Sequence, residues 1–171
     1  MNEIAQLGEM LRQHALSEEH KKQQFEEQAS AWAESIRGLY ADIEQWLEPV
    51  RSDGLLELQR EPYIAANAAF AATVSPFSTE KLAVTITGKT VELVPEVMGA
   101  KGSITLSVVG LPSDRYGSIS LICLPPSTEW WWRKDRGIKE PDLYPFTADF
   151  FAQQLQSLIP KLRESFDASD H

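Results

Sequence analysis

The segment Trp130–Arg136 combines three consecutive tryptophans with three basic residues. Aromatic rings beside basic side chains are typical of sites for single-stranded nucleic acid, and aromatic rings with arginine are common at the centres of protein interfaces. The alternative is a purely structural role, in which the segment is an edge strand whose rings pack on a helix end and on the aliphatic parts of basic side chains. The candidate interaction surface comprises Trp130, Trp131, Trp132, Arg133, Lys134 and Arg136.

The three rings of this segment should differ in exposure. In an extended chain Trp130 and Trp132 point to one face of the strand and Trp131 points to the other. A sheet that is covered on one side only cannot bury all three rings. We therefore expect the exposure of Trp131 to differ sharply from that of Trp130 and Trp132.

The net charge of the chain limits the classes of partner that we expect it to bind. The net charge is −9, and residues 1–60 carry 12 acidic and six basic residues, whereas residues 61–140 carry eight of each. Residues 141–171 carry five acidic and two basic residues. An acidic surface repels the phosphates of nucleic acids and anionic lipids. We expect no nucleic acid and no membrane as partner, and we expect any protein partner to be basic.

Residues suited to catalysis are sparse. The histidines His14, His20 and His171 have no cysteine nearby and show no metal-ligand spacing, and no Gly-x-Ser-x-Gly motif occurs. The tripeptide 88–90 (Gly-Lys-Thr) lacks the glycine that a phosphate-binding loop needs, because Ala83 stands there. We predict no catalytic residues, no cofactor and no metal, so the chain leans away from being an enzyme.

The single cysteine, Cys123, lies in the apolar run 119–124 and is expected to be a buried, inert thiol. No disulfide can form within the chain, which fits a reducing compartment. Residues 1–10 do not resemble a signal peptide, and no apolar run is long enough to cross a bilayer. These observations favour a cytoplasmic location.

The N-terminal third carries a regular stripe of large and apolar residues. Successive members are separated alternately by four and three residues, which keeps them on one face of a helix. This seam comprises Phe25, Ala29, Trp32, Ile36, Leu39, Ile43, Trp46 and Val50.

The seam becomes polar upstream of Phe25, and Ser17 resembles a helix N-cap. We favour two helices, residues 2–16 and 18–48, over one long helix with a solvated middle; Pro49 and Gly54 should end the second. Tryptophans in the seam favour packing on this chain's own sheet, and hence a monomer. A homodimer formed through residues 2–16 is the alternative.

Alternating apolar residues predict an antiparallel meander of four or five strands over residues 82–87, 91–97, 103–108, 118–124 and 128–133. A two-residue turn at 88–89 should join the first two strands. Residues 55–79 are harder to interpret. We expect a short strand that Pro62 ends, an alanine-rich helix or connection over 63–72, and a loop near Pro76. One face of the sheet is apolar and the other is rich in serine and threonine, so helices should cover one side.

A C-terminal helix capped by Thr147 should pack on the apolar face. The fold class is therefore α+β. Residues 1–50 should form a helical segment that packs on the domain or projects from it. Residues 51–166 should form the α+β domain, and residues 167–171 a flexible tail.

The small size, acidity and α+β plan resemble those of bacterial secretion chaperones and immunity proteins. That resemblance is of composition alone, so no site residue is carried over from it. We expect a non-enzymatic protein-interaction protein, of adaptor, escort or inhibitor type, that acts through its helical and tryptophan-rich surfaces. The alternative is a small-ligand binder or enzyme that uses the Ser/Thr-rich sheet face and the Trp130–Arg136 edge.

Overall fold

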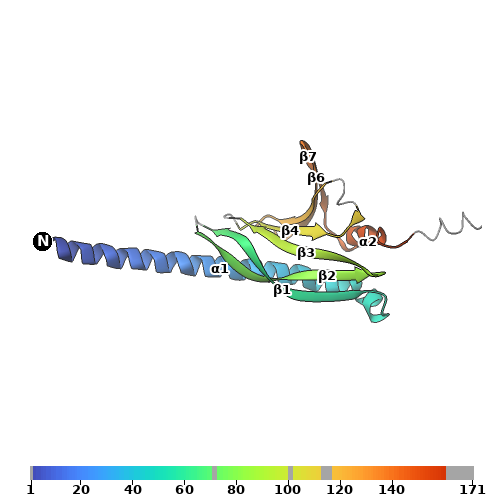
Figure 1. Ribbon diagram of the computed structural model, residues 1–171, viewed down its shortest axis with the longest axis horizontal. Coiled ribbons are helices and arrows are strands. Elements are labelled where there is room, and N and C mark those ends of the chain that lie inside the picture. The colour runs from blue at the N-terminus through green and yellow to red at the C-terminus, as the bar shows by residue number, and fades with distance from the viewer. Residues whose placement is uncertain (1, 71–72, 100–101, 113–116, 161–171) are drawn as a thin grey trace, which may run out of the picture.

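The computed structural model describes residues 2–70, 73–99, 102–112 and 117–160, and its elements confirm the α+β class (Figure 1). A long helix precedes an antiparallel sheet of seven strands, and a short helix follows it. The expected tail at 167–171 lies outside the described residues. The elements are α1 (Glu3–Ser52), β1 (Glu57–Phe70), β2 (Thr73–Ile86), β3 (Lys89–Met98), β4 (Ile104–Val109), β5 (Ile119–Cys123), β6 (Trp130–Arg136), β7 (Lys139–Pro145) and α2 (Ala148–Gln156).

Helix α1 is one unbroken helix of 50 residues, so the favoured break at Ser17 is wrong. Its N-cap is Asn2, whose side chain accepts a hydrogen bond from the backbone amide of Ala5 at 2.7 Å. Residues 17–24 contain no glycine or proline, and all of them except half-buried Gln24 are exposed. Lys21 pairs with Glu18 at 3.5 Å. Polar residues with good helix propensity continue a helix without burial. Figure 1 shows the N-terminal part of α1 projecting beyond the sheet.

Proline 49 does not end α1, contrary to expectation, and the helix continues to Ser52. The amide of Gly54 donates to the carbonyl of Arg51 at 2.9 Å, and Leu55 donates to Val50 at 3.2 Å. Gly54 has a φ of +73°, which favours glycine and turns the chain out of the helix. The left-handed turn at Gly54, rather than Pro49, therefore ends helix α1.

The meander has seven strands in sequential order, not four or five. The first additional element is the long β1–β2 hairpin, which replaces the short strand, the helix or connection and the loop expected over 55–79. Pro62 does not end β1, because an edge strand tolerates a residue without an amide proton. Ala65 and Ala68 are buried in the core, so the alanines fill inward positions of a strand rather than a helix face.

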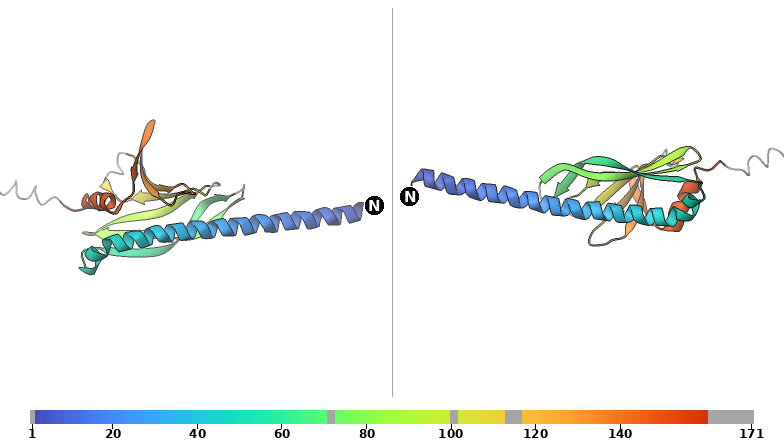
Figure 2. Two further views of the ribbon diagram at one scale, coloured as in Figure 1. Left: turned by 180° about the vertical axis from the view of Figure 1, so that it is seen from behind. Right: turned by 90° about the horizontal axis from the view of Figure 1, so that it is seen from below.

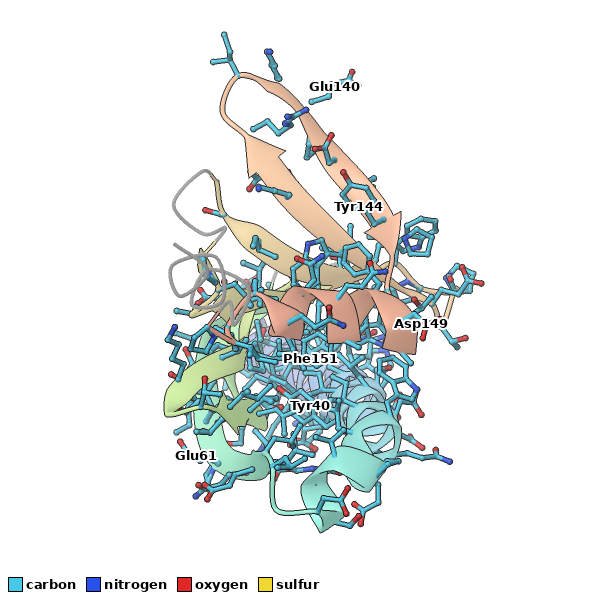
Figure 3. All side chains as sticks on the ribbon, turned by 90° about the vertical axis from the view of Figure 1, so that its right-hand side faces the viewer. Tyr40, Glu61, Glu140, Tyr144, Asp149 and Phe151 are labelled. Atoms are coloured by element: carbon cyan, nitrogen blue, oxygen red, sulfur yellow. The ribbon has the colours of Figure 1, made fainter. Side chains whose placement is uncertain are left out.

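Strand β7 was also missed, because its sequence does not alternate between apolar and polar residues. Most of its side chains are exposed. The β6–β7 hairpin stands away from the body of the domain, and Glu140 lies near its tip (Figure 3). A projecting strand has no buried face to impose a two-residue period.

The turn between β2 and β3 is one residue earlier than predicted. Ile86 pairs with Lys89 and Val84 pairs with Val91, so the turn residues are Thr87 and Gly88. Both have positive φ, +53° and +77°, as a type I′ turn requires. The resulting register differs from the predicted one by two residues, and the apolar side chains therefore stay on one face.

Both helices lie on the same side of the sheet (Figure 2), and α2 packs there as expected, with Phe151 and Leu155 buried. The Thr147 side chain accepts from the amide of Phe150 at 3.1 Å, so the predicted cap is confirmed. Inward-facing residues form ladders across adjacent strands. One ladder runs through Leu82, Leu93, Val108 and Ile119, and another through Met98, Ile104, Cys123 and Trp130.

The seam of α1 packs on these ladders within the same chain. Trp32 contacts Phe77 of β2 edge to face, with ring centroids 5.7 Å apart. Residues at the two ends of the seam are less covered, and Val50 is exposed. The buried side chains of α1 are Trp32, Ile36, Leu39, Tyr40, Ile43 and Leu47.

A polar contact fixes the register between α1 and the first two strands. The Tyr40 hydroxyl donates to the backbone carbonyl of Glu80 at 2.8 Å. Arg60 of β1 pairs with the Glu44 carboxylate through two nitrogens, and its guanidinium carbon lies 5.7 Å from the centroid of the Tyr40 ring. These directional bonds add specificity to the apolar packing.

Replacing Trp32 by alanine should lower the free energy of unfolding by about 3–5 kcal/mol, because a fully buried indole would leave a cavity. Chemical denaturation measures this loss, with Leu7→Ala as control, since Leu7 is 56% exposed. Sedimentation of the folded variant checks the oligomeric state. A Trp32→Ala protein of unchanged stability that only loses a dimer would show that the seam is an interface between chains.

The Tyr40→Phe variant tests the polar contact through pH. Burial, and after it the charge of Glu80, raises the pKa of Tyr40 above its ordinary value of 10.0. A raised pKa contributes stability that is complete below about pH 10 and is lost as the pH rises further. Below about pH 9 we expect Tyr40→Phe to cost about 1 kcal/mol, one net hydrogen bond.

Above pH 10 the difference in unfolding free energy between wild type and Tyr40→Phe should shrink. Lys81, whose pKa is raised mainly by its hydrogen bond to Glu92, is present in both proteins and cancels in the difference. Urea titrations across this range measure the effect. A difference that stays constant to high pH would contradict the buried, hydrogen-bonded hydroxyl.

Candidate functional site

A groove runs between α1 and the segment that connects β5 to β6. It consists of a larger hollow of about 600 Å³ and a smaller one of about 430 Å³. The two share four lining residues, namely Leu39, Asp42, Thr128 and Trp130, so they form one continuous surface that we call the α1 groove.

Small residues on α1 keep the groove open. Ala31, Ser35, Gly38 and Asp42 are spaced by four, three and four residues, so they lie on one face of the helix beside the seam. All four line the larger hollow. A Cβ atom added at Gly38 would meet no other atom within 4 Å, so the space in front of this residue is empty.

The core ladder supplies part of the opposite wall. Ile104 of β4, Cys123 of β5 and Trp130 of β6 are neighbours across the strands, and all three line the larger hollow. The groove therefore runs beside the covered apolar face of the sheet, because Ile104 is 1% exposed and Cys123 is 3% exposed while Trp130 is half-buried.

A short polar turn completes the rim. The Cys123 thiol donates to the carbonyl of Ser127 at 3.4 Å, and the Ser127 hydroxyl accepts from the amide of Glu129 at 3.1 Å. Pro125 and Pro126 lie between them and restrict the backbone. The rim presents fixed polar groups next to the apolar wall.

Trp32 lines the larger hollow and has one unpaired polar atom. The side chain is 1% exposed, and its ring contacts Phe25 and Phe77 edge to face. Its indole Nε1–H is buried and finds no acceptor among the described residues. A buried donor without a partner costs about 1–3 kcal/mol.

The smaller hollow is aromatic and acidic. Trp46 and Phe146 are in ring contact, with centroids 5.5 Å apart, and half-buried Trp130 lies on the same hollow. Asp42 and Glu129 add two carboxylates. No lysine, arginine or histidine is among the described residues that line either hollow.

The structure divides the predicted interaction surface. Trp130 and Trp131 line the smaller hollow, whereas Trp132 is 2% exposed and belongs to the core. The basic residues continue along the projecting hairpin, where Arg133 pairs with Asp135 at 3.0 Å and Arg136 pairs with Asp142 at 3.4 Å. Lys134 pairs across the strands with Ile119 of β5 and Asp142 of β7.

The predicted difference in exposure within the tryptophan cluster is wrong for Trp130. Trp130 and Trp131 are both half-buried, and only Trp132 is fully covered. Trp130 faces the covered side of the sheet, but it is the first residue of β6 and lies where the cover by α1 is incomplete. The exposure of the Trp130 ring therefore depends on its position at the end of β6 rather than on the alternation of side chains along the strand.

Sequence reasoning missed the α1 wall of the groove. Ala31, Ser35 and Gly38 repeat at helical spacing immediately beside the seam, and Asp42 stands four residues before Trp46. This spacing is visible in the sequence, but it marks a site only when an opposing wall is known.

The groove offers contacts for binding and lacks an activated nucleophile among its described residues. Burial raises the pKa of the Cys123 thiol, which keeps it neutral near pH 7 and lowers its reactivity. Across the described ranges, no three side chains of His, Cys, Asp or Glu gather closely enough to hold a metal ion. The chemistry available is stacking, hydrogen bonding and negative charge.

Comparison of the chain with models of known protein families, with curated proteins and with solved structures finds no match. Within the described residues, no helix combines the length and apolarity needed to cross a membrane. The functional argument therefore depends on the geometry of the groove.

Proposed function

We propose that this chain is a non-enzymatic protein-interaction protein that binds an extended segment of a partner protein in the α1 groove. The observation that carries the proposal is the pair of adjoining hollows of the α1 groove, bordered by half-buried Trp46 and Trp130 and kept open by small residues on α1. Half-buried tryptophans at a concave surface are common anchors of protein interfaces.

The form of the groove suits a polypeptide. Two adjoining hollows accept neighbouring side chains of an extended chain, and the polar rim at residues 127–129 can exchange hydrogen bonds with its backbone.

The projecting part of α1 supports an adaptor role. Ile4, Leu7 and Leu11 are exposed and are spaced by three and four residues, so they form a second apolar stripe. This stripe lies at the far end of the helix from the α1 groove (Figure 1). One chain then carries two separate surfaces for partners.

A small-molecule binding protein is the second candidate function. The larger hollow, at about 600 Å³, falls in the range of about 300–1,000 Å³ that is usual for small-molecule sites. This candidate requires that binding be confined to the larger hollow.

Selection from a displayed library of random peptides on the immobilised full-length protein tests the proposal. A selected peptide is then titrated by fluorescence anisotropy against wild type, Gly38→Leu and Ala41→Leu. Leucine at 38 occupies empty space inside the groove, and affinity should fall at least about 10-fold. Ala41 is exposed and lines neither hollow, so affinity for the Ala41→Leu protein should not change.

Thermal melting of both variants confirms that they are folded. Replacing a helical glycine should maintain or raise stability, since glycine is the less favourable residue by about 1 kcal/mol. Failure to select any peptide, or peptides that bind Gly38→Leu and wild type equally, would overturn the proposal.

A further inference from the structure

The smaller hollow of the α1 groove joins aromatic rings to carboxylates on both of its walls. Asp42 and Trp46 are four residues apart on α1, so their side chains emerge on the same face of the helix. Glu129 and Trp130 are consecutive at the start of β6. Phe146 contacts Trp46, and Phe146 and Trp131 contribute two further rings to this hollow.

The two carboxylates have no cationic partner among the residues that the structure describes. Neighbouring acids on α1 are paired: Glu44 pairs with Arg60, and Glu48 pairs with Arg51 at 3.5 Å. Asp42 and Glu129 take part in no ion pair of the described residues, and both are exposed on the rim of the hollow. The hollow therefore lacks a compensating positive charge from its own lining.

We propose that the smaller hollow receives a lysine or arginine side chain of the bound segment. Its cation would lie against the faces of Trp46 and Trp130 and pair with Asp42 and Glu129. The inference rests on the proposed function, because it specifies which residue of the segment occupies this end of the groove.

The physical basis is the joint action of ring faces and carboxylates. The face of an indole carries negative partial charge, and it attracts a cation within about 6 Å of its centre. Two carboxylates on opposite walls make the electrostatic potential inside the hollow more negative. A neutral side chain would desolvate these carboxylates without compensation, and an anion would be repelled.

The adjoining larger hollow favours a polypeptide over a free organic cation. A small ammonium compound would fill the smaller hollow alone and leave the larger hollow empty. A chain that places its basic side chain in the smaller hollow continues into the larger one, because the two hollows share lining residues.

Indole N–H signals in a nitrogen–proton NMR spectrum test the inference. The protein has five tryptophans, and single Trp→Phe variants assign their signals. The probes are the capped tripeptide Gly-Lys-Gly, its counterpart with norleucine, whose side chain is that of lysine without the ammonium group, and tetramethylammonium chloride. We expect the lysine peptide to shift the signals of Trp46 and Trp130. We expect the norleucine peptide to bind at least about 5-fold more weakly than the lysine peptide.

Charge-removing variants supply the second measurement. Asp42→Asn and Glu129→Gln should each lower the affinity for the lysine peptide by about 2- to 5-fold, the range for a partly exposed ion pair. Glu34→Gln is the matched control, because Glu34 is an exposed acid of α1 that lies outside the groove. Affinity for the control protein should equal that for wild type.

The possible failures are distinguishable. Equal binding of the lysine and norleucine peptides, no response of Trp46 and Trp130, or no effect of the two charge variants would overturn the cation site. The proposed function would still stand if library peptides depend on Gly38. Binding of tetramethylammonium as tight as that of the lysine peptide would overturn the polypeptide as occupant, because a free ammonium compound would then suffice.

Discussion

Six side chains of α1, from Trp32 to Leu47, fill the concave face of the sheet, and the other features of the domain follow from this packing. Each large apolar side chain that is buried contributes roughly 1.5–3 kcal/mol. An isolated helix is stabilised only weakly by its own hydrogen bonds, so the sheet anchors the C-terminal half of α1. The contact between Tyr40 and Glu80 then fixes how the helix lies along the strands.

The groove is a geometric consequence of the same packing. Seven strands at a spacing of about 4.8 Å span about 30 Å, whereas one helix covers only about 8–10 Å. The second helix is nine residues long and packs beside Phe146 and Trp132. The α1 groove remains between α1 and the start of β6, and the small residues beside the seam widen it. The buried seam and the wall of the groove thus lie on two adjacent faces of one helix.

Sequence periodicity was informative wherever one side of an element is buried. The seam, the strands β2 to β6 and the capped helix α2 all show the expected spacing, because burial imposes it. Strand β1 was truncated because Pro62 is tolerated at an edge, and β7 was missed because most of its side chains are exposed. The polar stretch 17–24 resembled a helix boundary because a projecting helix needs no apolar stripe.

The candidate site could be predicted only in part. The tryptophan cluster marked one wall of the groove, but it was grouped with Arg133, Lys134 and Arg136, which the hairpin carries away from Trp130. Asp42 and Trp46 are almost 90 residues from Trp130 in sequence, and only the folding of the meander brings them together. Small residues on a helix become informative only once the surface opposite them is known.

Intermolecular nuclear Overhauser effects between a library-selected peptide and the protein test the central claim most directly. The account predicts contacts from the side-chain methylene protons of a lysine or arginine in the peptide to the indole protons of Trp46 and Trp130, with neighbouring peptide residues near Ser35 and Cys123. Contacts that fall instead on the exposed stripe of Ile4, Leu7 and Leu11, or on the projecting β6–β7 hairpin, would contradict it.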